Sequence, residues 1–418
     1  MTPPRKLRLG RALRHRNYRL FFLGQGTSLV GTWLTRFAIG YETFALSHSA
    51  FQLGLVAFFS QAPTALIAPV AGVLVDRWDR HRTLIVTQIA AMLQSAALAV
   101  FALTSITVWH LMVLGAVQAV INAFDMPARQ SFLRQMVDDR ADLPNAIALN
   151  SSMVNGARLF GPILAAVIVD LVGIGWCFAI DAFSYLAVIG SLVAMKVAKQ
   201  PARIRGGRVR DELLDGLRYV RGVPMVRSLL LLLAATSVLG GAYISMLPAV
   251  AAQMHGGPHA LGWLMGAGGA GALVGTLFLA SRETVNGLTG VVANCCLGLS
   301  LGLIALEAAP AVWAALPILF VVGMALMVQW ASTNTLVQTL VVDDKLGRVM
   351  SLYAVAFFAG APVGALLVGS IASALGPIHA FAISGAGLLV CALTFRRALP
   401  GLRVVSRPRY AELGLLEE

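Results

Sequence analysis

The chain has 418 residues, of which 58% are hydrophobic and 12% are charged, and its formal net charge is +13. Ordinary soluble domains carry about 25% charged residues, so this composition excludes a soluble globular enzyme as the default. A chain of this length has room for about twelve membrane spans of about 20 residues joined by short loops.

Apolar runs long enough to cross a bilayer follow one another along the whole chain. The first six are predicted at residues 18–46, 50–75, 83–103, 109–135, 145–170 and 175–195. The second six are predicted at residues 226–251, 260–281, 288–306, 311–339, 347–373 and 377–395. We therefore expect an all-α integral membrane protein whose twelve transmembrane helices form an N-terminal bundle over 18–195 and a C-terminal bundle over 226–395.

Polar segments flank and separate the two bundles. They are a tail at residues 1–17, a linker at 196–225 and a second tail at 396–418. In the linker, Leu213, Leu214 and Leu217 recur at helical spacing beside charged residues. This pattern predicts an amphipathic helix that lies on the inner membrane surface and ties the two bundles together.

The basic residues fix the expected orientation. All but Arg36 and Arg158 lie in segments that share one side of the membrane when both termini are inside, and the outer loops contain none. Lys and Arg accumulate on the cytoplasmic side, so we expect cytoplasmic termini and a multi-pass membrane protein. Because these charges sit in loops and not on one soluble face, no nucleic-acid partner is expected.

The loop between the second and third spans carries a compact motif of polar residues. It contains Gly72, Asp76, Arg77 and Arg80. Glycine allows two helix backbones to approach closely, and a carboxylate is favoured beside the N-terminus of a neighbouring helix. We expect this loop to act as a latch at the cytoplasmic face, with the start of the eleventh span, around Gly347 and Arg348, as the acceptor.

The two halves repeat one another at an offset of about two hundred residues. Gly161-Pro162-Ile163 in the fifth span matches Ala361-Pro362-Val363 in the eleventh. Internal repeats of this kind are typical of transporters that bind their substrate between two related bundles. The sequence therefore predicts pseudo-symmetric bundles with a substrate path between them.

Charged residues inside the spans are the sharpest functional signals, because each costs roughly 2.5 to 3.5 kcal/mol at the bilayer centre. Asp125 and Arg129 are four residues apart on one helix face. Arg158 on the next span could either reach Asp125 or bind an anionic substrate through its guanidinium. A static ion pair and a proton-binding site are both open for Asp125. The candidate proton and substrate pathway is Arg36, Glu42, Asp125, Arg129, Arg158 and Asp181.

Other spans hold weaker signals. Arg36 has Glu42 and Asp181 as possible partners, and a static pair and a substrate site are both open for it. Gly156, Gly161 and Pro162 in the fifth span have the spacing of a helix-packing motif. The histidines lack neighbouring ligands and the four cysteines lie in apolar runs, so no metal and no cofactor is expected.

The loop motif Gly72-x-x-x-Asp76-Arg77 resembles the loop between the second and third helices of the major facilitator superfamily. The stretches Ala123 to Gln130, Asn145 to Asn150 and Gly216 to Arg221 resemble the bacterial branch that contains the enterobactin exporter and drug or macrolide efflux proteins. Gly161 and Pro162 resemble the Gly-Pro signature of its proton-driven exporters, although Ala165 and Ala166 replace later glycines of that signature.

This resemblance implies a secondary transporter of a bacterial cytoplasmic membrane that exports a small organic molecule, siderophore-like or a drug, by alternating access and in exchange for protons. We expect it to act as a monomer. Two other functions remain open from the sequence. One is a solute importer or facilitator with the same fold, and the other is a membrane sensor or assembly subunit that transports nothing. No enzyme activity is expected.

Overall fold

Long helices make up almost all of the described chain, because backbone groups inside a membrane must bond to one another. The computed structural model describes residues 10–133, 136, 137, 139, 142–195, 209–282 and 284–412, without the side chains of residues 69, 76, 144, 209–213 and 406–412. The N-terminal half contains η1 (Arg11–Arg14), α1 (Arg16–Ser47), α2 (Ala50–Phe59), α3 (Ala62–Arg77), α4 (Arg80–Thr104), α5 (Val108–Leu133), α6 (Leu143–Val172) and α7 (Ile174–Val193).

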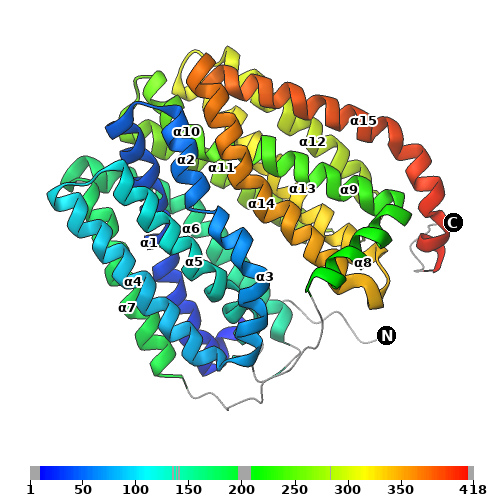
Figure 1. Ribbon diagram of the computed structural model, residues 1–418, viewed down its shortest axis with the longest axis horizontal. Helices are drawn as coiled ribbons and strands as arrows, with labels where there is room; N and C mark the ends of the chain where they lie inside the picture. The colour runs from blue at the N-terminus through cyan, green and yellow to red at the C-terminus, as the bar shows by residue number, and fades with distance from the viewer. Residues whose placement is uncertain are drawn as a thin grey trace.

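The linker and the C-terminal half continue the helical pattern. They contain α8 (Val209–Gly222), α9 (Pro224–Ala235), the π-helical turn Thr236–Gly240, α10 (Tyr243–Gln253), α11 (Gly257–Ala280), α12 (Leu288–Ala305), η4 (Leu306–Ala308), α13 (Val312–Leu340), α14 (Asp343–Leu375) and α15 (Pro377–Glu412). Figure 1 shows α1 to α7 as one group and α9 to α15 as a second group beside it. Helix α1 packs on α6 and α7 in the first group, and α12 packs on α13 and α15 in the second.

Eleven helical stretches of the described chain are long and apolar enough to cross a membrane. Helix α1 is not one of them, since it carries Arg16, Arg19, Arg36 and Glu42 along its length. It is nevertheless 32 residues long, or about 48 Å at 1.5 Å per residue, which exceeds the roughly 30 Å of a bilayer core. Twelve spans therefore stay a prediction, with α1 as the twelfth.

The second predicted span is interrupted in the structure. Helix α2 ends at Phe59 and α3 begins at Ala62, with Ser60 and Gln61 between them. Proline has no amide proton, so Pro63 cannot make the helical bond that would run to the carbonyl of Phe59. The uninterrupted helix expected over residues 50–75 is therefore corrected to two helices.

Two spans of the C-terminal half also differ from their predicted form. The seventh changes to a π-helical turn at Thr236–Gly240, where the amide of Gly241 bonds to the carbonyl of Thr236 at 2.8 Å. The twelfth continues beyond residue 395, because α15 extends to Glu412. Residues 396–412, expected as part of a tail, are thus helical.

The helix directions give the molecule two distinct ends. We call the basic end the one at which Arg77, Arg80 and Arg348 lie, and the far end the one at which Ser49 and Gly376 lie. Helices α1, α4 and α6 run from the basic end to the far end, and α2, α5 and α7 run back. Consecutive helices are therefore antiparallel.

The two halves are packed tightly together at the far end. Helix α2 contacts α14, and α6 contacts α11. A Cβ at Gly54 would collide with the carbonyl oxygen of Ala365, and one at Gly369 would lie 2.9 Å from the carbonyl oxygen of Ala50. A Cβ at Gly262 would lie 2.7 Å from that of Ala166. The closure uses glycines because no other residue permits these backbone approaches.

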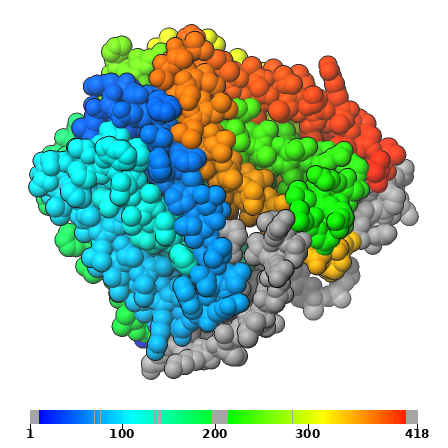
Figure 2. Space-filling model, in the orientation of Figure 1, coloured from blue at the N-terminus to red at the C-terminus, as the bar shows by residue number. Residues whose placement is uncertain are grey.

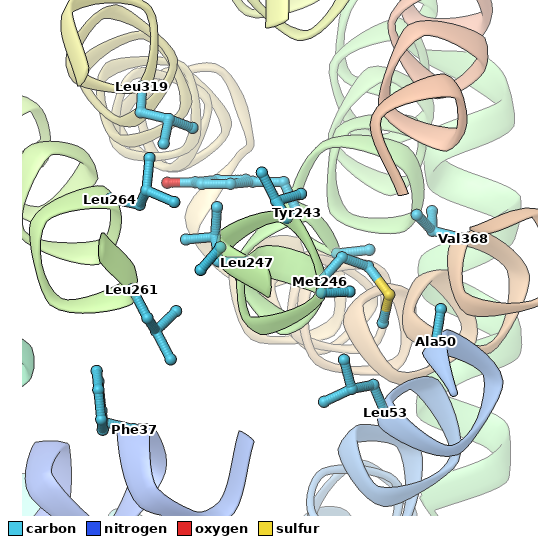
Figure 3. Packing of buried hydrophobic residues seen from close by; sticks show 14 of the residues in the cluster. Phe37, Ala50, Leu53, Tyr243, Met246, Leu247, Leu261, Leu264, Leu319 and Val368 are labelled. Carbon is cyan, nitrogen blue, oxygen red and sulfur yellow. The ribbon is translucent and has the colours of Figure 1, made fainter. Parts of the chain in front are cut away.

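Apolar side chains seal the same interface. Figure 3 shows Phe37 of α1 facing Leu261 of α11, and Leu53 of α2 facing Met246 and Val368. These five side chains are all at most 3% exposed. This part of the far-end contact is thus apolar and closely packed. At the same end, a cavity of about 410 Å³ is lined by residues of both halves, among them His48, Ser49, Gln253 and Ser373.

The same helices lose this contact toward the basic end. Gly156 of α6 and Gly347 of α14 have no atom within 4 Å of the position of a Cβ, and Val355 of α14 is 45% exposed. In Figure 2 the dark blue and orange surfaces of the two halves meet at the far end and separate toward the basic end. The structure is closed at the far end and open at the basic end.

Candidate functional site

Asp79 and two aromatic or imidazole side chains fix the loop between α3 and α4 in place. Asp79 caps α4, because its carboxylate accepts a hydrogen bond from the amide of Arg82 at 2.9 Å. His81 lies 2.8 Å from the carbonyl oxygen of Leu192, which ties the loop to α7. Trp78 stacks on Phe124 with ring centroids 5.9 Å apart.

The remaining residues of the loop motif differ from the expectation. Gly72 has no atom within 4 Å of a Cβ position, so the close helix approach expected there is absent in this state. Arg77 is exposed at the end of α3, and Arg80 is the first residue of α4. The side chain of Asp76, the predicted latch, lies outside the described residues.

The predicted acceptor at the start of α14 is already paired with a different carboxylate. Asp215 of α8 forms an ion pair with Arg348 and lies 3.2 Å from the Nζ of Lys345. Gly216 sits close to the backbone of Arg348, which allows α8 to rest directly on α14. In this state the linker helix supplies the carboxylate that sequence reasoning assigned to Asp76.

An equivalent cluster lies at the start of α6 in the N-terminal half. Asp142 is 1% exposed and pairs with Arg14 at 2.6 Å, Arg11 at 3.2 Å and His15 at 3.0 Å. The hydrogen bond from His15 and the neighbouring arginines hold the pKa of Asp142 below its usual value of 3.8, against the effect of burial. In each half, ion pairs thus anchor the segment before the first span to the start of the fifth span, which is α6 in the N-terminal half and α14 in the C-terminal half.

Asp125 is buried and its hydrogen bonds are filled. It is 2% exposed, forms an ion pair with Arg129 and accepts hydrogen bonds from Gln88 at 2.7 Å and Thr87 at 3.0 Å. Arg158, which the sequence offered as a second partner, forms no ion pair with it among the described residues. Two alternatives were considered for Asp125, a static ion pair and a proton-binding site. This geometry favours the static ion pair.

Asp181 has a different environment. It is 1% exposed, and its Oδ2 accepts hydrogen bonds from Thr35 at 2.7 Å and Ser95 at 2.8 Å. Its Oδ1 has no hydrogen-bond partner, and within the described chain no arginine, lysine or histidine pairs with it. The pairing of Asp181 with Arg36 that the sequence left open is therefore not observed.

Hydroxyl partners leave Asp181 free to change its protonation state. The hydroxyls of Thr35 and Ser95 both donate and accept hydrogen bonds, so they can satisfy a carboxylate or a carboxylic acid. A carboxylate locked to a guanidinium, such as Asp125, lacks this freedom because removing its charge leaves a buried cation unpaired. The two buried carboxyl groups therefore differ in their partners, since Asp125 is paired with a cation and Asp181 is bonded to hydroxyl groups.

Two of the arginines inside the spans, Arg36 and Arg158, lie together at the boundary between the halves. The guanidinium carbons of Arg36 and Arg158 lie 5.0 and 5.9 Å from the ring centroid of Trp33. Both distances are within the range of cation–π attraction. Arg158 also lies within hydrogen-bonding reach of the hydroxyl of Tyr243, which belongs to the C-terminal half.

Glu42 stands apart from this group. It lies further along α1 toward the far end and is partly exposed. In the described part of the chain no ion pair joins Glu42 to Arg36. The pairing considered for Arg36 in the sequence is thus replaced by contact with an aromatic ring.

The glycine motif of α6 contributes to this geometry. A Cβ at Gly161 would collide with the Cβ of Trp33, so Gly161 allows the indole to lie against α6. Pro162 is placed inside the helix, and its carbonyl faces Gly262 across the interface. Gly156, by contrast, has open space around it. One of the two glycines therefore acts in packing in this state.

Sequence reasoning missed several residues that complete the site. Trp33 and Tyr243 are aromatic residues in apolar runs, where membrane packing is their common use. Tyr185 of α7 is 5% exposed and interacts electrostatically with Asp181 and with Arg36. The spacing of Trp33 three residues before Arg36 was a usable signal, because such residues share a helix face.

The sequence as a whole resembles known membrane transporters. Residues 11–409 match the family described as transmembrane secretion effector, within the major facilitator superfamily. The chain belongs to this family. It is 25% identical over 386 residues to the staphyloferrin A transporter of Staphylococcus aureus, covering 90% of this chain and 94% of that protein. It is 24% identical over 403 residues to the enterobactin exporter EntS of Citrobacter koseri, covering 94% of each.

Solved structures show the same fold at low identity. A bacterial homolog of the human lysosomal transporter Spinster superposes with a TM-score of 0.67 at 16% identity, covering 94% of this chain and 97% of that chain. A peptide transporter in complex with alafosfalin has a TM-score of 0.75 at 13% identity, covering 92% and 94%. This protein is thus a multi-pass membrane transporter of the major facilitator superfamily, in its siderophore exporter branch.

Proposed function

We propose that the protein is a proton-driven exporter of a small, siderophore-like organic molecule across a bacterial cytoplasmic membrane. Asp181, a buried carboxyl group with hydroxyl partners and no cation, is the observation that carries the coupling to protons. The relatives named for staphyloferrin A and enterobactin support the substrate class. The protein acts as a monomer, in which the two halves enclose the path.

In this proposal α1 is the twelfth span and both termini are cytoplasmic. The basic end then faces the cytoplasm, where Lys and Arg accumulate. The observed state, closed at the far end, is the one that takes up cytoplasmic substrate. Rocking of the halves about the boundary exposes the same site to the outside.

The latch at the basic end belongs to the other half of the cycle. When the two halves close at that end, Asp76 approaches the start of α14, where a helix N-terminus and Arg348 favour a carboxylate. In the observed state, Asp215 forms the ion pair with Arg348. If Asp76 replaces Asp215 at Arg348 when the basic end closes, the linker helix α8 is part of the gate.

Export is tested by the small molecules that cells retain. Mass spectrometry would compare a strain that lacks the protein, the same strain with the gene restored, and the restored strain with its proton gradient collapsed. Export by proton exchange predicts that one endogenous metabolite accumulates in the first and third samples. A metabolite that is instead depleted in the deletion strain would show uptake and contradict export.

A further inference from the structure

Two positive charges within the spans lie against one tryptophan at the boundary between the halves. The other intramembrane cation, Arg129, is paired with Asp125. Arg36 and Arg158 form no ion pair within the described residues, and each acts on the other as a like charge. A charged side chain within a membrane span is costly and marks a functional site by default. An anion from outside the chain would supply the partner that these two arginines lack.

The surroundings of the two arginines form a site that both halves share. A small cavity of about 10 Å³ is lined by Trp33 and Arg158 from one half and by Tyr243, Ile244, Leu247 and Met265 from the other. Arg36 lies beside it on α1 and is exposed, in a structure whose halves separate toward the basic end. A ligand at the arginines would therefore touch both halves, as transport between them requires.

The donors at this site favour particular ligand chemistry. A guanidinium presents a planar fork of N–H groups that matches the two oxygens of a carboxylate. Two guanidinium groups beside one ring can each bind a separate carboxylate of the same molecule. Tyr243 adds a hydroxyl, and Trp33 adds an apolar face for the carbon skeleton.

We propose that Arg36 and Arg158 form the substrate-recognition site for an organic polycarboxylate, a ligand with at least two carboxylate groups. This inference rests on the proposed transport function and names its substrate class. Trp33 orients both guanidinium groups, and Tyr243 contacts the bound ligand from the C-terminal half. A neutral ligand of the same shape leaves both arginines uncompensated and binds weakly.

Binding to the purified full-length protein in lipid nanodiscs tests the site directly. Isothermal titration calorimetry at neutral pH and constant ionic strength would compare succinate, citrate and butane-1,2,3,4-tetracarboxylate with acetate and with the neutral trimethyl ester of citrate. The polycarboxylates should bind, and acetate and the ester should bind at least about tenfold more weakly. The site is overturned if no polycarboxylate binds, or if the ester binds as well as citrate.

Variants locate the binding within the molecule. Arg36→Gln and Arg158→Gln should each weaken polycarboxylate binding by about tenfold or more, whereas Arg397→Gln, a change at an exposed arginine of α15, should leave it unchanged. Equal binding by all three variants would overturn the assignment. If a site variant does not fold, the comparison of citrate with its ester in the unmodified protein still decides the matter.

These outcomes separate the site from the export proposal. If polycarboxylates fail to bind while a deletion strain retains a metabolite, the anion site is overturned and export stands. If they bind through the two arginines while the deletion changes no metabolite, export is overturned and the anion site stands.

Discussion

The two halves of the molecule bury different polar groups within their helices. The N-terminal half buries the carboxyl groups of Asp125 and Asp181 and carries both unpaired arginines. In the C-terminal half, the buried polar centre is Gln329, which is 0% exposed and bonds to Thr236 at 3.1 Å and Thr333 at 3.3 Å. One six-helix architecture thus carries the charged chemistry in one copy and neutral hydrogen bonds in the other.

This asymmetry assigns different tasks to the halves. A neutral amide bonded to hydroxyls is inexpensive to bury and has no proton to exchange near neutral pH. A lone carboxyl group can take up and release a proton as its surroundings change. Under the proposed function, energy coupling would belong to the N-terminal half, and the C-terminal half would form the opposite wall of the site.

The largest effect is expected at Asp181. Asp181→Asn keeps the size and hydrogen bonding of the side chain but removes the exchangeable proton, so export should fall by at least about 100-fold. Gln329→Leu is the matched change in the other half. It removes one interhelical hydrogen bond, to Thr236, worth about 0.6 kcal/mol and should reduce export by a factor of about three. Retained metabolite per cell, normalised to protein in the membrane, measures both, and equal losses would break the comparison.

The glycine seam between the halves gives the next largest effect. Gly54→Ala places a methyl group against the carbonyl of Ala365 and should destabilise the far-end-closed state by about 1 to 3 kcal/mol. Spin labels on cysteines at positions 170 and 259, in a background without the native cysteines, report that closure. Their dipolar coupling should weaken in Gly54→Ala and persist in Gly190→Ala, where the added methyl meets open space. Unchanged coupling in Gly54→Ala would contradict the seam.

The two anchoring clusters at the basic end differ in burial and should differ in effect. Asp142 is 1% exposed and has three basic partners, so Asp142→Asn should lower the thermal midpoint more than Asp215→Asn, whose side chain is 34% exposed. Because folding lowers the pKa of Asp142, its contribution is complete above about pH 4, the usual pKa, and is lost as the pH falls below it. The gap between the wild type and Asp142→Asn should therefore close in acid, and a constant gap would contradict this account.

The smallest effect is expected at the rim of the far end. His259 of α11 lies 3.3 Å from Asp170 of α6, and both side chains are about half exposed. An exposed ion pair contributes about 0 to 1 kcal/mol, so His259→Gln should change the far-end closure by less than about fivefold. The same spin-label measurement, with both labels moved to residues next to 170 and 259 so that the pair stays intact, would detect a larger change and thereby assign this pair a gating role.

Much of the architecture was predictable from local patterns. Apolar runs and basic loops predict helix positions and directions without any knowledge of packing, because the bilayer imposes both. The interruption after Phe59 was also predictable in principle, since Pro63 marks it. The π-helical turn at Thr236–Gly240 was not, because it depends on how the seventh span packs against α13 and α14.

The partners of the charged residues were less predictable. Asp125 and Arg129 are four residues apart on one helix, so their pair follows from helix geometry alone. Asp181 bonds to Thr35 of α1 and Ser95 of α4, which depends on the rotation and tilt of three helices. The same holds for Trp33, which lies between Arg36 and Arg158 because Gly161 leaves room for it.

The central claim, that Asp181 carries the exchangeable proton, can be observed directly. Infrared difference spectroscopy of the purified protein in lipid, after a step in pH, reports the carbonyl stretch of a protonated carboxyl group. The account predicts a carboxylic acid band that appears on acidification in the unmodified protein and in Asp125→Asn, and is absent in Asp181→Asn. A band that survives Asp181→Asn and disappears in Asp125→Asn would contradict it and make the Asp125 and Arg129 pair the site of proton exchange.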